Sequence, residues 1–339
     1  MRKSLIFGIL ASALVFSAGG ALFTAQAQAK SVKLIANTIK SKDDFGTKAY
    51  VDFAKRVKEY TNGEVIVEVH FGGELGYKAA DGLRVVENGS VDMGETIGAF
   101  EGATVPDIMI TTLPFFITTF DEFAFFDRLF RRHLDKLYAK RNAKILFTNS
   151  MTKQHFWNKK EVDTVADVAG VKMRTYDKVT TDMLSAVGAA PLRIDYSELY
   201  TALQQGTVAG MVTSIASVID LKAWEVVKYA NLTGFSTGGI NSLAINMKTW
   251  NSLSPKNQAA MLQAAREVED ALRVDVPALE RTGLDTLTAN GMTVNAVPPE
   301  TIAEMRKLTA PIRDAFLKTK ASPELRAIVD KYEKIRGLK

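Results

Sequence analysis

The sequence predicts an α/β protein with two hydrophobic cores. Of the 339 residues, 47% are hydrophobic, 24% charged and 9% aromatic, a balance typical of packed globular chains rather than disordered or fibrous ones. Domains usually take roughly 100 to 200 residues, so this length favours two cores. Strand and helix patterns alternate along the chain, and the composition shifts near residue 150. Such alternation favours largely parallel sheets with ligands at the carboxyl ends of the strands.

Residues 1–29 have the layout of a cleaved export signal. Arg2 and Lys3 precede an apolar run over residues 5–16, and the segment ends in the small-residue sequence 25–29, Ala-Gln-Ala-Gln-Ala. A membrane anchor is the alternative, but the apolar run is short for a span and is followed by two glycines. We therefore expect cleavage after Ala27 or Ala29.

Charge and cysteine content exclude several function classes. Without the signal the chain has 41 basic and 38 acidic side chains, a net charge of +3, which is too mild to indicate a nucleic-acid partner. The sequence contains no cysteine, so disulfides, thiolate metal sites and thiol nucleophiles are excluded.

The first half reads as alternating strands and helices. Apolar or alternating runs predict strands at 32–36, 65–69, 91–93 and 144–147. Apolar residues at helical spacing predict helices over 50–60 and about 83–89. Thr119 and Glu122 form a capping box ahead of a helix with a heavy aromatic stripe, which we assign to the core.

The second half continues the pattern. It has predicted strands at 172–174, 208–214 and 241–247, and helices at about 179–187, 195–206, 254–284, 298 onward and 323–337. The helix from Ser254 is long enough to join two lobes. Pro277 inside it should kink or divide it, because proline lacks the amide hydrogen that a helix needs.

A search for catalytic chemistry finds no recognisable set. His70, His133 and His155 form no metal-binding spacing, and the sequence has no nucleophile elbow or phosphate loop. Residues 71–76, Phe-Gly-Gly-Glu-Leu-Gly, lack the lysine of a phosphate loop and favour a tight turn. We therefore expect a protein that is not an enzyme and that needs no cofactor and no metal.

Several motifs together resemble the substrate-binding proteins of tripartite ATP-independent periplasmic (TRAP) transporters, in the family that is similar to the dicarboxylate receptors. They are Asp-Val-Ala-Gly-Val-Lys-Met-Arg at 167–174, Ser-Glu-Leu-Tyr-Thr-Ala-Leu-Gln-Gln-Gly at 197–206, Val-Ala-Gly at 208–210, the 71–76 motif, Glu-Asn-Gly-Ser-Val-Asp-Met at 87–93 and Leu-Pro-Phe-Phe at 113–116.

The resemblance implies a two-lobed periplasmic binding protein fold. Each lobe would be a sheet flanked by helices, and hinge strands and a long shared helix would join the two. We expect lobe I to comprise 30–150 plus 240–279 and lobe II 151–239 plus 280–339. The resemblance also implies that Arg174 pairs with a substrate carboxylate, a role that suits a planar, permanently charged guanidinium.

Departures from the family pattern bear on the substrate. Gln154 stands twenty residues before Arg174, where members with acid-rich substrates carry a second arginine. Thr213 takes the place of a substrate-contacting amide. The resemblance places the 100–101 loop at the cleft. The remaining candidates for the binding site are Phe100, Glu101, Trp157 and Trp224.

We therefore predict a periplasmic receptor, a monomer, that binds a small organic acid between two lobes and delivers it to a TRAP permease. There are two alternatives. One is a receptor of an ATP-driven importer or sensor, and the other is a secreted enzyme that acts on small acids. The neutral Gln154 favours a single carboxylate with a neutral or apolar remainder. A dicarboxylate remains open, because Lys153 or Lys42 could supply a second charge.

Overall fold

A computed structural model describes residues 31–337. The predicted export signal and its cleavage site lie outside the described residues. Within residues 31–337, no helix is both long enough and apolar enough to cross a bilayer.

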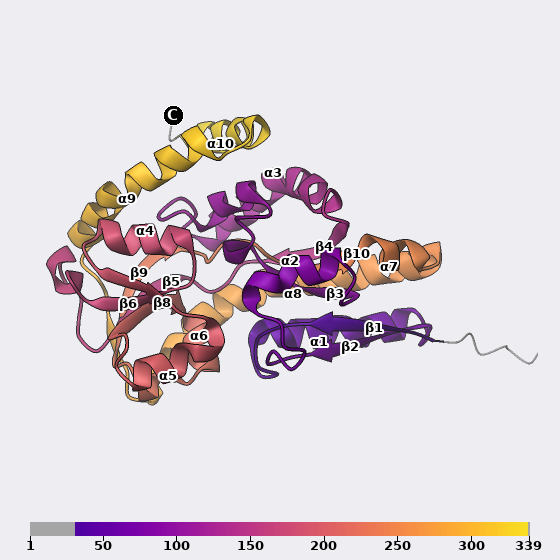
Figure 1. Cartoon of the computed structure of the whole chain (residues 1–339), viewed down its shortest axis with the longest axis horizontal. Coiled ribbons are helices and arrows are strands. Elements are labelled where there is room, and N and C mark those ends of the chain that lie inside the picture. The colour runs from indigo at the N-terminus through magenta and orange to yellow at the C-terminus, as the bar shows by residue number, and fades with distance from the viewer. Residues whose placement is uncertain (1–30, 338–339) are drawn as a thin grey trace, which may run out of the picture. The chain divides into compact units, whose positions relative to one another are not determined.

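Two separate sheets organise the chain (Figure 1). The first has five strands in the order β2-β1-β3-β10-β4. Its strands are β1 (Val32–Asn37), β2 (Val65–His70), β3 (Met93–Ile97), β4 (Ala143–Asn149) and β10 (Asn241–Asn246). Strand β1 pairs in parallel with β2 and β3, whereas β10 runs antiparallel to both β3 and β4.

The second sheet has six strands in the order β11-β9-β5-β8-β6-β7. Its strands are β5 (Gln154–Asn158), β6 (Lys172–Thr175), β7 (Ala190–Arg193), β8 (Gly210–Ser214), β9 (Tyr229–Ser236) and β11 (Thr293–Asn295). Strand β5 runs antiparallel to β8 and β9, and β6 runs parallel to β7 and β8. Both sheets are therefore mixed, where the sequence pattern predicted largely parallel ones. In each sheet one strand runs against the others, β10 in the first and β5 in the second. Each of these two strands enters directly from the other sheet, β5 after β4 and β10 after β9, rather than after a crossover helix.

Helices cover the faces of both sheets. They are α1 (Phe45–Tyr60), α2 (Gly82–Glu87), α3 (Phe120–Ala139), α4 (Lys178–Ala186), α5 (Leu199–Gln204), α6 (Ile215–Asp220), α7 (Met247–Ser252), α8 (Pro255–Ala289), α9 (Pro299–Thr319) and α10 (Pro323–Ile335). The capping box predicted for α3 is confirmed, since the Thr119 hydroxyl accepts from the Glu122 amide and the Glu122 carboxylate accepts from the Thr119 amide. The aromatic stripe of α3 is buried, as predicted.

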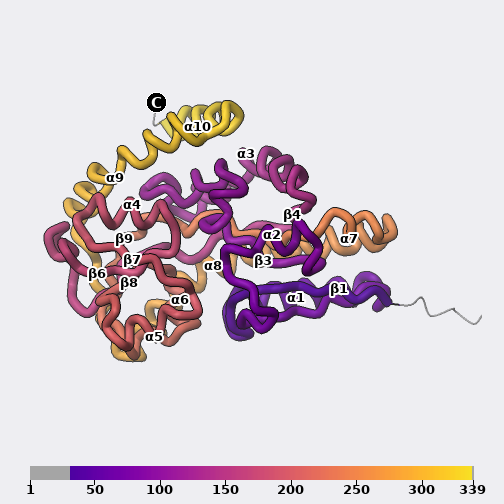
Figure 2. The backbone as a smooth tube through the Cα atoms, in the orientation of Figure 1, coloured from indigo at the N-terminus to yellow at the C-terminus, as the bar shows by residue number. Residues whose placement is uncertain are grey.

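Helix α8 is shared by both sheets. It packs on α1 and β4 of the first sheet and on α6 and β11 of the second. It runs as one α-helix over 35 residues with Pro277 inside it, so the proline does not divide it. The backbone trace shows α8 passing from one half of the fold to the other (Figure 2).

Helices α9 and α10 arc from the second sheet back to the first (Figure 1). Helix α10 packs on α3, and Leu325, Val329 and Tyr332 are buried in the same cluster as Phe126 of α3. The expectation that all of 280–339 belongs with the second lobe is therefore wrong for α10. Its apolar face completes a core built on the first sheet. The other lobe boundaries stay predictions.

Candidate functional site

A pocket lies where edges of the two sheets face each other. From the first sheet come Ile97, at the end of β3, Asn241, at the start of β10, and the 39–40 loop after β1. From the second sheet come Arg174 near the end of β6, Thr213 and Ser214 at the end of β8, and Gln154 at the start of antiparallel β5. Because β5 and β10 run antiparallel to their neighbours, their starts lie at the same sheet edge as the carboxyl ends of β3, β6 and β8. This is the edge where α/β sheets place ligands. The cavity measures about 50 Å³, which suits a small molecule, since one ordered water needs ~10–15 Å³.

Arg174 is a buried cation without a carboxylate partner. The residue is 2% exposed, and among the described residues no carboxylate oxygen lies within 4.0 Å of its nitrogens. Its Nε donates to the Ile194 carbonyl at 3.0 Å, and its guanidinium lies 5.4 Å from the centroid of the Tyr176 ring. Burial lowers the pKa of Arg174 to about 10, so the group stays charged at neutral pH. The two terminal nitrogens remain available for a bidentate anion.

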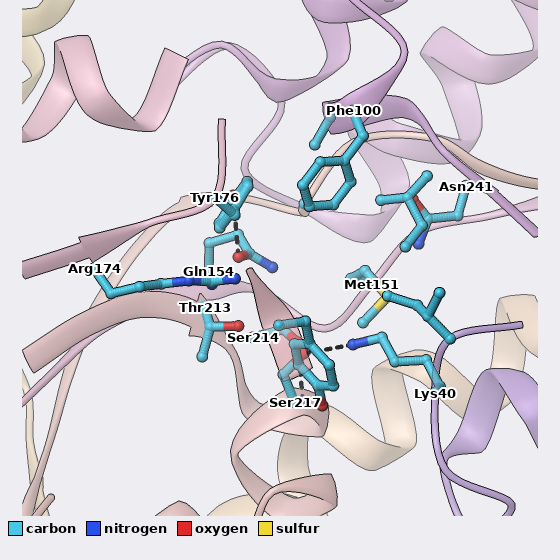
Figure 3. Close-up of a pocket in the computed structure, with 15 residues that line it drawn as sticks. Lys40, Phe100, Met151, Gln154, Arg174, Tyr176, Thr213, Ser214, Ser217 and Asn241 are labelled. Atoms are coloured by element: carbon cyan, nitrogen blue, oxygen red, sulfur yellow. Dashed lines mark hydrogen bonds between the residues drawn. The ribbon is translucent and has the colours of Figure 1, made fainter. Parts of the chain in front are cut away.

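Lys40 is a second buried cation, and it comes from the first sheet. It is 5% exposed, and no carboxylate oxygen of the described residues lies within 4.0 Å of its ammonium. The ammonium lies 3.3 Å from the Ser217 hydroxyl and 3.7 Å from the centroid of the Tyr196 ring. Figure 3 shows Lys40 on one side of the cavity and Arg174 on the other.

The 71–76 turn holds the loop that carries Lys40. The amide of Gly72 donates to the Lys40 carbonyl at 2.6 Å, and the amide of Gly73 donates to the Thr38 carbonyl at 3.4 Å. Both glycines have positive φ, +65° and +72°, a conformation that costs other residues energy. The predicted tight turn is confirmed. Its position beside β1 gives it a role in presenting Lys40 to the pocket.

Buried carboxyl groups surround the Lys40 loop at longer range. Glu95 accepts from the Thr38 hydroxyl at 2.7 Å, and that hydroxyl also accepts from the Lys40 amide at 3.2 Å. Burial raises the pKa of Glu95 to about 7, partly opposed by the charge of Lys40. Burial likewise raises the pKa of Asp44, which caps α1. These groups keep the surroundings of Lys40 polar without pairing with its ammonium.

Further polar groups line the cavity. Gln154 accepts from the Tyr176 hydroxyl at 3.2 Å and donates to the Thr152 carbonyl at 3.3 Å, and Figure 3 shows this pair beside Arg174. Asn241 is 1% exposed, and its buried Oδ1 has no hydrogen-bond partner among the described residues. Apolar contact surface is supplied by Ile39, Ile97, Ala99, Phe100 and Met151.

Four of the residues expected from the sequence meet at this pocket: Arg174, Gln154, Thr213 and Phe100. Trp157 does not line it. Trp157 is fully buried in the core against α5, α6 and α8, and its indole nitrogen donates to the Thr213 carbonyl at 2.9 Å. Side chains alternate along β5, so Trp157 lies on the face opposite Gln154. Trp224 packs against the same core and does not line the pocket. The two tryptophans therefore support the second sheet rather than wall the cleft.

Glu101 also lies outside the pocket. It is 2% exposed, and its carboxylate accepts from the Leu83 amide at the start of α2 at 3.0 Å. The chain turns after Phe100, which sends the two neighbouring side chains in different directions. Burial raises the pKa of Glu101 to about 7. Glu101 is a structural group that anchors α2.

We expect Glu101→Gln to stabilise the fold above pH 7. In the unfolded chain Glu101 has the ordinary pKa of a glutamate, near 4.5. It therefore loses its proton at a lower pH in the unfolded chain than in the folded chain. Between pH 4.5 and 7 the folded state therefore binds more protons, and its stability falls as pH rises. The glutamine keeps the bond from Leu83 without this loss, so we expect a gain of up to about 3 kcal/mol at pH 8. Denaturant unfolding from pH 5 to 8 measures it.

The exposed Glu161 provides the matched control. Glu161→Gln should leave the pH profile of unfolding unchanged. A Glu101→Gln protein that is no more stable at pH 8 relative to pH 5 than the parent would contradict the assignment of a buried, protonatable Glu101.

The sequence interpretation missed Lys40, Tyr176, Tyr196 and Asn241. The lysines that it considered as second cations lie elsewhere: Lys42 is exposed, and the Lys153 ammonium lies 6.0 Å from the centroid of the Phe120 ring, outside this pocket. The available signal was positional, because Lys40 follows the carboxyl end of the first strand. Tyr176, two residues after Arg174, had the same signal.

Comparisons with known proteins agree with this architecture. Residues 35–320 match the family described as bacterial extracellular solute-binding protein, family 7. A solute-binding protein of Sulfitobacter sp. (strain NAS-14.1) is 28% identical over 304 residues, which cover 87% of this chain and 89% of that protein. The C4-dicarboxylate-binding periplasmic protein DctP of Rhodobacter capsulatus is 27% identical over 227 residues, 66% of this chain and 67% of that protein.

Solved structures give the same result. An extracytoplasmic solute receptor of Bordetella pertussis that binds pyroglutamic acid has a TM-score of 0.85 at 25% identity, covering 89% of this chain and all of that chain. A TRAP solute-binding protein from a marine metagenome, specific for pyroglutamate, has a TM-score of 0.83 at 27% identity, covering 90% and 99% of the two chains. With the family match spanning most of its length, this chain belongs to family 7 of the bacterial extracellular solute-binding proteins, the solute receptors of TRAP transporters.

Proposed function

We propose that the chain binds a small organic anion between its two sheets and delivers it to a TRAP permease. One observation carries the proposal: Arg174 is buried at the pocket with its terminal nitrogens unpaired and no carboxylate of the described residues within 4.0 Å. A buried unpaired charge is costly to the fold. An anionic ligand supplies the missing partner, and a bidentate carboxylate matches the guanidinium geometry.

Lys40 supports an anion on independent grounds. It reaches the cavity from the opposite sheet and also lacks a carboxylate partner within 4.0 Å among the described residues. An acid with an oxygen-rich second end would engage both cations, whereas a monocarboxylate would engage Arg174 alone. Named relatives bind acids of several kinds, among them pyroglutamate and C4-dicarboxylates. The cavity of about 50 Å³ favours the smaller members of this range.

A melting-temperature screen tests the proposed function. The panel is L-pyroglutamate, succinate, pyruvate, D-erythronate and D-glucuronate, with glucose and an amino acid amide as uncharged and cationic controls. A ligand at ~100 times its dissociation constant adds about 2.7 kcal/mol to the free energy of unfolding, which corresponds to a rise of a few degrees for a protein of this size. We expect at least one acid to raise the melting temperature and the controls to leave it unchanged. Stabilisation only by the controls would contradict the proposal, and chemical conversion of a bound acid would favour an enzyme.

The proposed location is the periplasm, where the signal at residues 1–29 would direct the chain before it is cleaved off. Family membership and the layout of residues 1–29 support it. N-terminal sequencing of protein from the periplasmic fraction should begin at Gln28 or Lys30.

A further inference from the structure

Several of the contacts between the two sheets lie close together beside the pocket. The Ser41 hydroxyl, in the loop after β1, donates to Asp220 at the end of α6. The Tyr196 hydroxyl, from the segment before α5, donates to the other oxygen of Asp220 at 2.6 Å. One carboxylate thus accepts from a residue of the first half and a residue of the second. We call Ser41, Tyr196 and Asp220 the Asp220 junction.

The junction continues into the cavity through the Tyr196 ring. Tyr196 lines the pocket, whereas Asp220 does not. The face of the ring lies under the Lys40 ammonium, 3.7 Å from its centroid, a cation–π geometry. Asp220 holds the hydroxyl end of that ring. The ring is therefore fixed at its far end by Asp220 and presents its face to the ligand-facing lysine.

The Tyr196–Asp220 bond lies within the second half. The contacts of Ser41 with Asp220 and of Lys40 with Ser217 and Tyr196 span the two sheets and exist only while the sheet edges are together. Ser41 and Lys40 belong to the loop after β1, and Tyr196, Ser217 and Asp220 belong to elements of the second sheet. A separation of a few ångströms breaks all of these inter-sheet contacts together, because hydrogen bonds weaken steeply beyond about 3.5 Å. A hydrogen bond to a carboxylate is stronger than one between neutral groups. The junction favours the arrangement in which a ligand is enclosed, although Asp220 does not line the cavity.

We propose that Asp220 is a positioning residue for ligand retention: by holding Ser41 and Tyr196 it keeps the sheet edges together over a bound acid and slows the acid's release. The inference rests on the proposed function. It assigns a part of ligand affinity to a carboxylate that repels anions and does not line the pocket.

Asp220→Asn and Tyr196→Phe test the inference. Asparagine keeps the size of Asp220 but is a neutral acceptor at one oxygen only. Phenylalanine keeps the ring under Lys40 and removes the hydroxyl. The probe is whichever acid of the melting-temperature panel binds the parent protein, and its association and release rates are measured by stopped-flow fluorescence. We expect each variant to release the probe about tenfold faster with an association rate within about threefold of the parent.

Two matched controls separate this role from general damage. The Tyr200 hydroxyl also donates to a carboxylate, that of Glu225, within the second half alone, so Tyr200→Phe should not change release. Lys78 pairs with Asp195 at 2.8 Å between the two halves but is exposed, so Lys78→Gln should change release less than twofold.

A double-mutant cycle of Ser41→Ala and Asp220→Asn completes the test. The fold-changes in release rate caused by Ser41→Ala and Asp220→Asn should not multiply in the double variant, because both substitutions affect the same Ser41–Asp220 contact. Unchanged release in Asp220→Asn, or effects of Ser41→Ala and Asp220→Asn that multiply fully, would overturn the inference while leaving acid binding intact. A purely structural role would be indicated if Asp220→Asn changed the association rate by the same factor as the release rate and also lowered the melting temperature of the ligand-free protein. That result would overturn the inference. Failure of every acid in the panel to bind the parent would contradict the proposed function instead.

Discussion

Arg174→Ala is expected to weaken the binding of the best acid in the panel by roughly 30- to 4,000-fold. Truncating one partner of a buried, hydrogen-bonded charge pair costs on the order of 2 to 5 kcal/mol, much of it from the anion left without a partner. Arg174→Lys should recover only part of this loss, because an ammonium is a point charge and lacks the fork. Titration calorimetry on the three proteins measures the effect.

The ligand-free variant provides a second readout. Arg174 is buried without a carboxylate within 4.0 Å among the described residues, so its removal should not lower the melting temperature of the ligand-free protein. The exposed Arg84, paired with Asp81, serves as control, and Arg84→Ala should bind as the parent does. Parent-like affinity in both Arg174 variants would return Arg174 to a packing role.

Lys40→Met is expected to discriminate between classes of acid. Methionine fills much of the same volume and removes the charge that faces the cavity from the first sheet. A hydrogen bond to a charged group contributes about 1.5 to 3 kcal/mol, so acids with a second anionic end, such as succinate, should lose about 10- to 100-fold in affinity. Pyruvate, which has one carboxylate for Arg174, should change by less than about threefold.

The comparison of succinate with pyruvate in the same variant is its internal control. Equal losses for both acids would show that Lys40 acts on the cavity as a whole and not on a second anionic end. A parent protein that binds pyruvate but not succinate would support the single-carboxylate prediction made from Gln154.

The sequence predicted the outlines of the fold because its signals are local. The Thr119–Glu122 capping box, the positive-φ glycines of the 71–76 turn and the proline at the start of α8 each specify backbone geometry through neighbouring residues. The strands β5, β7, β9 and β11 and the place of α10 were missed. Their positions depend on contacts with distant segments, which local periodicity does not encode.

The same distinction applies to the site. Arg174 was found because it ends a recognisable motif on a predicted strand. Trp157 was misplaced because β5 was not predicted, and without the strand the alternation of side chains could not assign its face. Lys40 was missed because its partners, Ser217 and Tyr196, lie more than 150 residues away in the sequence. A cavity between two sheets brings together residues whose shared environment exists only after folding.

The shared helix α8 has a consequence for recombination between relatives. The chain passes between the sheets at 150–153, at 237–240, along α8, and a fourth time along α9 and α10. Neither half of the fold is therefore a continuous stretch of sequence. A chimera made with one exchange point would pair strands or helix faces from different parents within the same sheet or core. Transferring the ligand preference of a relative to this chain thus requires several exchange points, placed in the crossings, so that each sheet keeps all of its own strands.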